Sequence, residues 1–168
     1  MTREIKTYPD PVLREQNCEV EAVTDSMKAL AKDMIETMYA NKGIGLAAPQ
    51  IGENLKLITV DISGGESGED PIVLFNPQLG NLEGESESEE GCLSVPEFTC
   101  MIKRAERLTV SGLDVEGEPV TLEAEGLLAV CLQHEVDHLQ GRLILDHASR
   151  LKRNMYDKKV SKWQKRTP

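Results

Sequence analysis

Residues 126–140 have the sequence GLLAVCLQHEVDHLQ, and this stretch decides both the fold and the chemistry of the chain. Its apolar residues recur at helical spacing, and Gly141 follows directly, so we predict an α-helix over 126–140. In a helix, residues four positions apart lie on the same face, about one turn from each other. The pattern therefore places His134 and His138 side by side, with Glu135 next to the first of them.

Two imidazoles at this spacing can bind one metal ion, and the intervening glutamate can act as a general base toward water at that ion. The third ligand then decides the class of enzyme. Metzincin-type enzymes place a third histidine six residues after the second, where this chain has Ile144. Thermolysin-like enzymes use a glutamate from a later helix, and no glutamate follows His138. A metalloprotease of another H-E-x-x-H type remains an alternative.

Two cysteines are candidates for the third ligand. Cys131 precedes His138 by seven residues, which is about 10 Å along a helix axis, whereas a thiolate ligand lies about 2.3 Å from its metal. We therefore interpret Cys131 as a core residue and favour Cys92, in the stretch EGCLSVP at 90–96. One sulfur and two nitrogen ligands leave a fourth position for water, as catalytic sites do. His147, just beyond the helix, is interpreted as a residue of a surface turn.

The rest of the chain favours an α+β fold. Apolar residues recur at intervals of three and four over 25–41, which predicts an amphipathic helix capped by Thr24 or Asp25. Four stretches have the composition of strands: 55–62, 72–75 (closed by Asn76-Pro77), 106–115 and 120–123. The last two are expected to form an antiparallel pair. A third helix is predicted over 149–168, with its apolar residues roughly on one side: Leu151, Met155, Tyr156, Val160 and Trp163.

The 168 residues suit a single domain, and their net charge of −10 argues against a general binder of nucleic acids or anionic membranes. The charge is unevenly distributed, because residues 149–168 hold eight basic side chains and one acidic one. We therefore describe one domain with a catalytic part, 1–148, and a basic C-terminal helix, 149–168. No specific DNA binding is expected.

Location and redox state follow from the same composition. The charged start lacks the apolar core of a signal peptide, and no apolar run approaches the roughly 20 residues of a membrane helix. We therefore expect a cytoplasmic protein without membrane contact, whose four cysteines are thiols.

Three stretches together resemble the signature boxes of the peptide deformylases: Gly43–Gln50 (GIGLAAPQ), Glu90–Pro96 (EGCLSVP) and Gln133–His138 (QHEVDH). The opening Tyr8–Arg14 (YPDPVLR) is also similar to that family, so the resemblance covers nearly the whole chain. It implies an α+β fold in which antiparallel or mixed sheets pack around a central metal-binding helix, with N-terminal and C-terminal helices. It also implies a metal-dependent hydrolase that removes the N-formyl group from the initiator N-formylmethionine of nascent polypeptides and releases formate.

The resemblance further implies roles for single residues. Cys92, His134 and His138 would be the metal ligands, and Glu135 would transfer protons. The side-chain amide of Gln50 and the backbone N–H of Leu93 would bind the formyl oxygen. The family usually works with Fe²⁺, and Zn²⁺, Ni²⁺ or Co²⁺ can occupy the site. The remaining residues expected to bind substrate or to support its site are Gly43, Ile44, Gly45, Glu90, Gly91, Leu127, Val130 and Cys131.

Several features depart from or extend the family pattern. Ile102-Lys103-Arg104 stands where many relatives have Val-Pro-Arg, and Phe98-Thr99 replaces polar residues at the rim, so rim contacts are expected to differ. Arg104 is still expected to pair with Glu90. Some relatives dock on the ribosome through a C-terminal helix, which makes 149–168 a candidate docking element. The alternatives are a solvated helix held by Leu151, Met155 and Trp163 and, for the whole protein, a non-catalytic ribosome-associated module.

Overall fold

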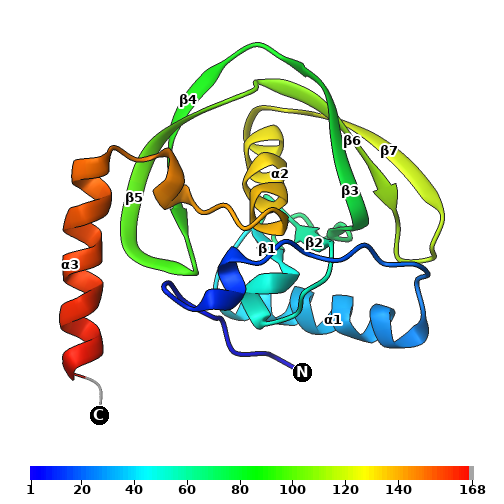
Figure 1. The fold of residues 1–168 in the computed structure, drawn as a ribbon. Helices are drawn as coiled ribbons and strands as arrows, with labels where there is room; N and C mark the ends of the chain where they lie inside the picture. Colours follow the sequence, from blue (N-terminus) through cyan, green and yellow to red (C-terminus); the bar gives the residue numbers. More distant parts are fainter. Residues whose placement is uncertain (167–168) are drawn as a thin grey trace.

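Helix α2, Gly126–Leu139, lies at the centre of the fold, and the strands curve around it (Figure 1). The structure, a computed structural model, describes residues 1–166. Its other helices are α1 (Asp25–Ala40) and α3 (Arg150–Arg166), and three short 3₁₀ turns, η1, η2 and η3, cover Pro11–Arg14, Ala48–Ile51 and Ile144–His147. No helix within residues 1–166 is long and apolar enough to cross a membrane.

Within residues 1–166, seven strands form two antiparallel sheets. The larger sheet has the order β1-β2-β3-β6-β7, and the smaller one is the β4–β5 hairpin. The strands are β1 (Gly45–Ala47), β2 (Leu57–Val60), β3 (Ile72–Glu83), β4 (Ser86–Cys92), β5 (Val95–Arg104), β6 (Arg107–Leu113) and β7 (Pro119–Glu125). The predicted α+β class is confirmed, and so is the antiparallel pairing of β6 with β7.

Three apolar clusters hold these elements together. The face of α2 that carries Ala129 and Leu132 packs on β2 and β6, where Ile58 and Val110 are fully buried. Helix α1 packs mainly on β1 and β2 through methionines such as Met34 and Met38. The third cluster joins β5 to η3 and α3. Each helix thus contributes one apolar face, and α2 keeps its opposite face for the polar residues.

Helix α1 begins and ends close to the predicted positions. The side chain of Thr24 caps its start by accepting a hydrogen bond from the backbone N–H of Met27 at 3.4 Å. At the other end, the N–H of Gly43 donates to Met38 O, and the chain then turns into β1. The length of α1 therefore determines where the segment 43–50 meets the centre of the molecule.

The strand predicted over 72–75 is longer than expected, because it does not end at Asn76-Pro77. Strand β3 runs on to Glu83, and its register with β6 shifts between Phe75 and Gln78. The proline therefore falls at an irregularity, where its missing N–H breaks no regular ladder. Asn76 has a left-handed backbone (φ 53°), and its side chain bonds the backbone of Val20 in both directions.

The apolar residues of α3 do not share one face as predicted. Tyr156 and Val160 are buried against β5, and the Tyr156 hydroxyl donates to Pro96 O at 2.7 Å. Leu151 and Met155 are 71% and 63% exposed, so they do not hold the helix. The reason is the helical period: Leu151 and Met155 are four residues apart on one stripe, and Tyr156 and Val160 lie about 100° or more around the helix. Residues 167–168 of the predicted helix lie outside the described residues.

Candidate active site

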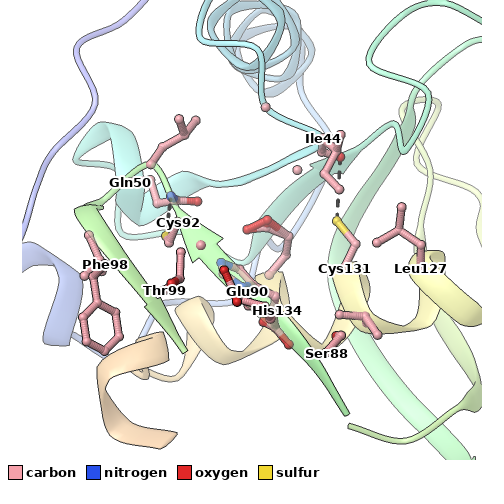
Figure 2. Close-up of a pocket in the computed structure, with 18 of the residues that line it drawn as sticks. Ile44, Gln50, Ser88, Glu90, Cys92, Phe98, Thr99, Leu127, Cys131 and His134 are labelled. Carbon is pink, nitrogen blue, oxygen red and sulfur yellow. Dashed lines mark hydrogen bonds and ion pairs between the residues drawn. The ribbon is translucent and has the colours of Figure 1, made fainter. Parts of the chain in front are cut away.

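A cavity of about 620 Å³ opens between strand β1, the β4–β5 hairpin and helix α2 (Figure 2). The segments 43–50, 90–93 and 127–135 line it, although they are far apart in the sequence. Every predicted site residue except His138 lines this cavity: Gly43, Ile44, Gly45, Gln50, Glu90, Gly91, Cys92, Leu93, Leu127, Val130, Cys131, His134 and Glu135. His138 lies one helical turn beyond His134, buried at 1% exposure.

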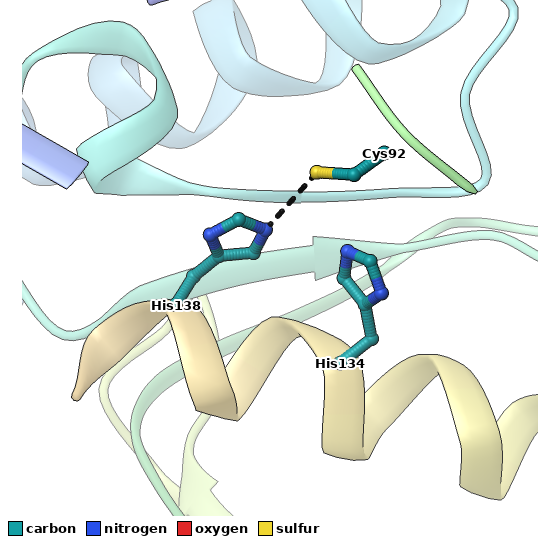
Figure 3. Close-up of side chains that lie close together, drawn as sticks. All are labelled: Cys92, His134 and His138. Carbon is teal, nitrogen blue, oxygen red and sulfur yellow. Dashed lines mark hydrogen bonds between the residues drawn. The ribbon is translucent and has the colours of Figure 1, made fainter. Parts of the chain in front are cut away.

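Cys92, His134 and His138 form a cluster that could hold a metal ion (Figure 3). One ligand atom of each residue lies within 4.8 Å of those of the other two. The two histidines project from one face of α2, and Cys92, the last residue of β4, approaches them from the opposite side, with its Sγ 3.4 Å from His138 Nε2. A thiolate and two imidazoles are a donor set suited to zinc, iron and similar transition metals.

The other candidates for a third ligand lie outside this cluster. The thiol of Cys131 points toward Ile44, the residue just before β1, and its Sγ lies 3.7 Å from Ile44 O (Figure 2). Burial raises the pKa of this thiol well above its usual value. His147 Nε2 lies 3.1 Å from Asp137 Oδ2 on the outer side of α2. All four cysteines are free thiols, as expected.

Glu90 supports the cluster from β4. Arg104 forms two hydrogen bonds with its carboxylate, each 2.9 Å long, and both side chains are almost completely buried. The predicted pair is therefore buried rather than exposed. Arg104 also contacts Asp137 Oδ2 at 2.7 Å, so that one guanidinium ties β4 and β5 to helix α2. The same Glu90 carboxylate accepts a hydrogen bond from His134 Nδ1.

These contacts set the charges around the cluster. Burial by itself raises the pKa of the Glu90 carboxyl, but hydrogen bonds from Arg104 and His134 outweigh it and lower that pKa to about 2. Burial lowers the pKa of His138 well below its usual value, so that this imidazole is neutral and can donate a lone pair. For His134, burial acts in the same direction, but hydrogen bonds with Cys92 and Glu90 outweigh it and raise the pKa well above the usual value.

Glu135 is buried at the floor of the cavity, with 2% of its surface exposed. Burial raises the pKa of its carboxyl to about 7. Its Oε1 atom has no hydrogen-bond partner within residues 1–166. A side chain at Gly45 would collide with this carboxylate, because a Cβ there would lie 2.6 Å from Glu135 Oε2. The glycine therefore allows β1 to approach the carboxylate closely.

Gln50 reaches the cavity from η2 (Figure 2). Its Oε1 atom accepts a hydrogen bond from the backbone N–H of Ala47 at 2.9 Å. Its Nε2 atom lies 3.1 Å from Ser94 Oγ and 3.6 Å from Cys92 Sγ. Leu93 and Ser94 form the two-residue turn between Cys92 and Val95, so the backbone of Leu93 lies next to the cluster.

Some residues of the site are not predicted by the sequence. Lys42, Ser88, Glu89 and Glu97 also line the cavity, and nothing in their own residue type or spacing indicated it. The contact of Ser94 with Gln50 and the link of Asp137 to Arg104 were not predicted, although both residues lie within the family motifs EGCLSVP and QHEVDH.

Comparisons with known proteins agree with this geometry. A sequence model described as polypeptide deformylase matches residues 2–154. A peptide deformylase of Desulfotalea psychrophila is 50% identical over 160 residues, which are 95% of each chain. Among solved structures, a peptide deformylase from Legionella pneumophila superposes with a TM-score of 0.91 and 45% identity, covering 100% of both chains. A peptide deformylase from Ehrlichia chaffeensis in complex with actinonin gives a TM-score of 0.89 at 38% identity and covers 96% of both chains.

The matched stretch includes all three clustered ligands, Glu135 and Gln50, and it ends within α3. A match over this share of the chain, with this identity and this agreement in fold, leaves no other family to consider. The chain belongs to the polypeptide deformylase family.

Proposed function

We propose that this protein is a metal-dependent hydrolase that removes the formyl group from N-formylmethionyl nascent polypeptides and releases formate. One observation carries the proposal: a cysteine and two histidines cluster at metal-binding distance, and the cysteine and one of the histidines line a cavity together with a buried carboxylate and a side-chain amide. The family relationship supports the same reaction.

An extended peptide can enter the cavity between two strand edges. Strand β1 is the edge of the larger sheet, and β4 pairs only with β5 among the described strands. Such edges present backbone N–H and C=O groups that can pair with an added strand. We propose that Gly43, Gly45 and Gly91 let the substrate backbone approach these edges. Ile44, Leu127, Val130 and Cys131 would then contact the methionine side chain.

We propose Fe²⁺ as the ion, with Zn²⁺, Ni²⁺ or Co²⁺ as substitutes. The residues fit such an ion, since Cys92 and the two histidines form a mixed sulfur and nitrogen set and His138 is held neutral by burial. When bound, the ion supplies Lewis acidity, which lowers the pKa of water and polarises a carbonyl. The protein residues provide proton transfer and hydrogen bonds to the reacting atoms.

Glu135 would take the proton of the attacking water and later deliver it to the departing amine, which becomes the free N-terminus. Its buried Oε1, without a partner among the described residues, can accept that proton. Gln50 Nε2 and the backbone N–H of Leu93 would donate hydrogen bonds to the formyl oxygen as negative charge develops on it. Loss of one such donor typically lowers a rate about 10²- to 10³-fold.

The decisive experiment measures formate release from a formyl-Met peptide by the metal-loaded protein. Glu135→Gln keeps the shape of the side chain and removes the base, so we expect turnover to be lost while the metal is retained. Cleavage of an internal peptide bond without deformylation would favour the metalloprotease alternative. Unchanged turnover in Glu135→Gln would contradict the role assigned to Glu135. Absence of turnover in the metal-loaded wild type on both kinds of substrate would favour a non-catalytic protein.

We further propose that α3 docks this cytoplasmic enzyme on the ribosome. Several cations of α3 are exposed, and Lys158, Lys162 and Lys165 line a surface pocket on the helix together with Asp157 and Ser161. Leu151 and Met155 add an exposed apolar stripe. Because Tyr156 and Val160 are buried, α3 belongs to the same domain as residues 1–148, and deleting it would also remove core contacts. Charge reversal is therefore the cleaner test.

For this test we propose Lys162→Glu, with Lys32→Glu on α1 as the matched control. If α3 docks on RNA phosphates, Lys162→Glu should bind the ribosome more weakly, and the slope of log affinity against log salt concentration should fall by about one unit. Lys32→Glu should change neither quantity. Deformylation of short peptides should be unchanged in both variants. Equal ribosome affinity of the two variants would mean that α3 is only a solvated terminal helix.

A further inference from the structure

Ser94 contacts the side chain of Gln50, and we infer that it is a positioning residue for the reaction: its hydroxyl fixes the amide that binds the formyl oxygen. The inference rests on the proposed function, because it presupposes that role for Gln50. Ser94 is fully buried, and its Oγ accepts a hydrogen bond from Gln50 Nε2 at 3.1 Å. The two residues come from different segments, 44 positions apart.

The orientation of the Gln50 amide is determined at both of its ends. At one end, the backbone N–H of Ala47 can only donate, so the atom that faces it must be the amide oxygen. The nitrogen therefore lies at the other end, where it carries two hydrogens. Ser94 Oγ accepts one of them. The second is directed toward Cys92 Sγ, 3.6 Å away, and thus toward the cluster that could hold the metal (Figure 2).

No other oxygen within residues 1–166 accepts a hydrogen bond from Gln50 Nε2. Gln50 itself is only 2% exposed, so water cannot readily replace the serine. Without the hydroxyl, only the bond to Ala47 would hold the amide, and rotation about its last torsion, which is broad for glutamine, would be less restricted. The donor would then no longer point at one fixed place in the cavity.

The turn between β4 and β5 does not by itself require a serine. Neither Leu93 nor Ser94 is among the residues with a left-handed backbone, so the turn needs no special conformational freedom at either position. The backbone oxygen of Ser94 separately accepts a hydrogen bond from the N–H of Tyr8 at 2.8 Å. An alanine would keep this bond and the turn. Ser94→Ala therefore removes the contact with Gln50 and little else.

The test is a double-mutant cycle with Ser94→Ala, Gln50→Ala and the combination, each assayed on a formyl-Met peptide. We expect Ser94→Ala to lower kcat about 10- to 100-fold, because displacing a reacting group by about 1 Å can cost about 10²-fold. KM and metal content should be unchanged, since the contact matters as charge develops in the transition state. In the Gln50→Ala background, Ser94→Ala should have no further effect on kcat.

Two results would overturn the inference: an unchanged kcat in Ser94→Ala, or effects of the two substitutions that simply add. Either would leave the proposed function intact if Gln50→Ala lowers kcat. If Gln50→Ala has wild-type kcat, the proposed role of Gln50 fails, and the inference fails with it. If Ser94→Ala does not accumulate as a folded protein, Ser94→Gly removes the same hydroxyl and takes its place in the cycle.

Thr59→Val is the matched control for loss of a buried hydroxyl. Thr59 is also fully buried, and its Oγ1 contacts Met38 Sδ at 3.7 Å between β2 and α1, away from Gln50. We expect this variant to change thermal stability but not kcat. A similar decrease of kcat in Thr59→Val would show that loss of any buried hydroxyl disturbs the site, which would contradict a specific role for Ser94.

Discussion

Glu90 Oε1 lies 3.0 Å from His134 Nδ1, so the carboxylate fixes which ring nitrogen of this histidine carries a proton. Because an ionised carboxylate only accepts hydrogen bonds, Nδ1 is the donor, and in the neutral imidazole that a metal would bind, Nε2 carries the lone pair. Arg104 in turn holds the carboxylate with two hydrogen bonds. The candidate metal site is thus oriented by a buried ion pair that belongs to the smaller sheet.

The first prediction concerns this support. Glu90→Gln keeps the size of the side chain but removes its charge, and it leaves Arg104 with a weaker buried partner. We expect metal affinity to fall about 10- to 100-fold, as is typical when such an outer partner is lost. A competition titration with a metal-binding dye measures it. Glu87→Gln, on the same strand but exposed, is the control; equal affinities of the two variants would contradict the role of Glu90.

The second prediction concerns the approach of β1 to helix α2. In Gly45→Ala, the added methyl would lie 2.6 Å from Glu135 Oε2 and 2.8 Å from Cys131 Sγ. Either β1 or the side chains of α2 must shift. We therefore expect kcat to fall by about 10²-fold, the effect of displacing a reacting group by about 1 Å. Steady-state assays give kcat, and circular dichroism checks the fold. Wild-type kcat in a folded Gly45→Ala protein would show that turnover does not depend on the exact position of the Glu135 carboxylate.

The third prediction concerns stability in acid. Burial raises the pKa of the Asp146 carboxyl, but hydrogen bonds from Arg14 and the Leu143 N–H outweigh it and lower the pKa below the ordinary 3.8. A lowered folded-state pKa stabilises the protein above the unfolded value, and this stabilisation is lost as pH falls toward the folded value. Asp146→Asn should therefore lower the free energy of unfolding by about 1 kcal/mol at pH 7, after allowance for solvent screening.

Denaturant unfolding at pH 7 and pH 3 tests this prediction. The difference between Asp146→Asn and the wild type should shrink in acid, whereas Glu66→Gln, in an exposed loop, should match the wild type at both pH values. A difference for Asp146→Asn that stays constant down to pH 3 would show that the ionised carboxylate is not the source of the stability.

The fourth prediction concerns metal removal. If an ion binds the Cys92, His134 and His138 cluster in the folded state only, it stabilises that state by about 2.7 kcal/mol at a free concentration of 100 Kd. A chelator should therefore lower the Tm of the wild type, and added metal should restore it. His138→Ala removes one ligand, so its Tm should respond far less. An equal response of both proteins would place the bound metal elsewhere.

The elements that local patterns determine were predicted well. Helix α1 and its Thr24 cap follow from apolar spacing and a cap residue, and the β6–β7 hairpin follows from two short runs around Glu116-Gly117. The predicted strand 72–75 is too short because Asn76-Pro77 commonly ends a strand. Only the pairing of β3 with β6 shows that the strand continues past these residues with a shift of register. The prediction that the apolar residues of α3 share one side is wrong, because Leu151 and Met155 are as apolar as Tyr156 and Val160 and residue type alone does not show which of them pack.

The sequence by itself determined the helix at 126–140 and the pair of histidines on one of its faces, because helical geometry relates residues only a few positions apart. Resemblance to a family added roles for two motifs far from this helix in the sequence, Gly43–Gln50 and Glu90–Pro96. The sequence favours Cys92 as the partner of these histidines, and the tertiary structure brings it beside them. That Arg104 links Glu90 to Asp137 and that Ser94 contacts Gln50 follows from the tertiary structure alone. These contacts join residues 14 to 46 positions apart, and the packing of two sheets on one helix, rather than any local pattern, brings them together.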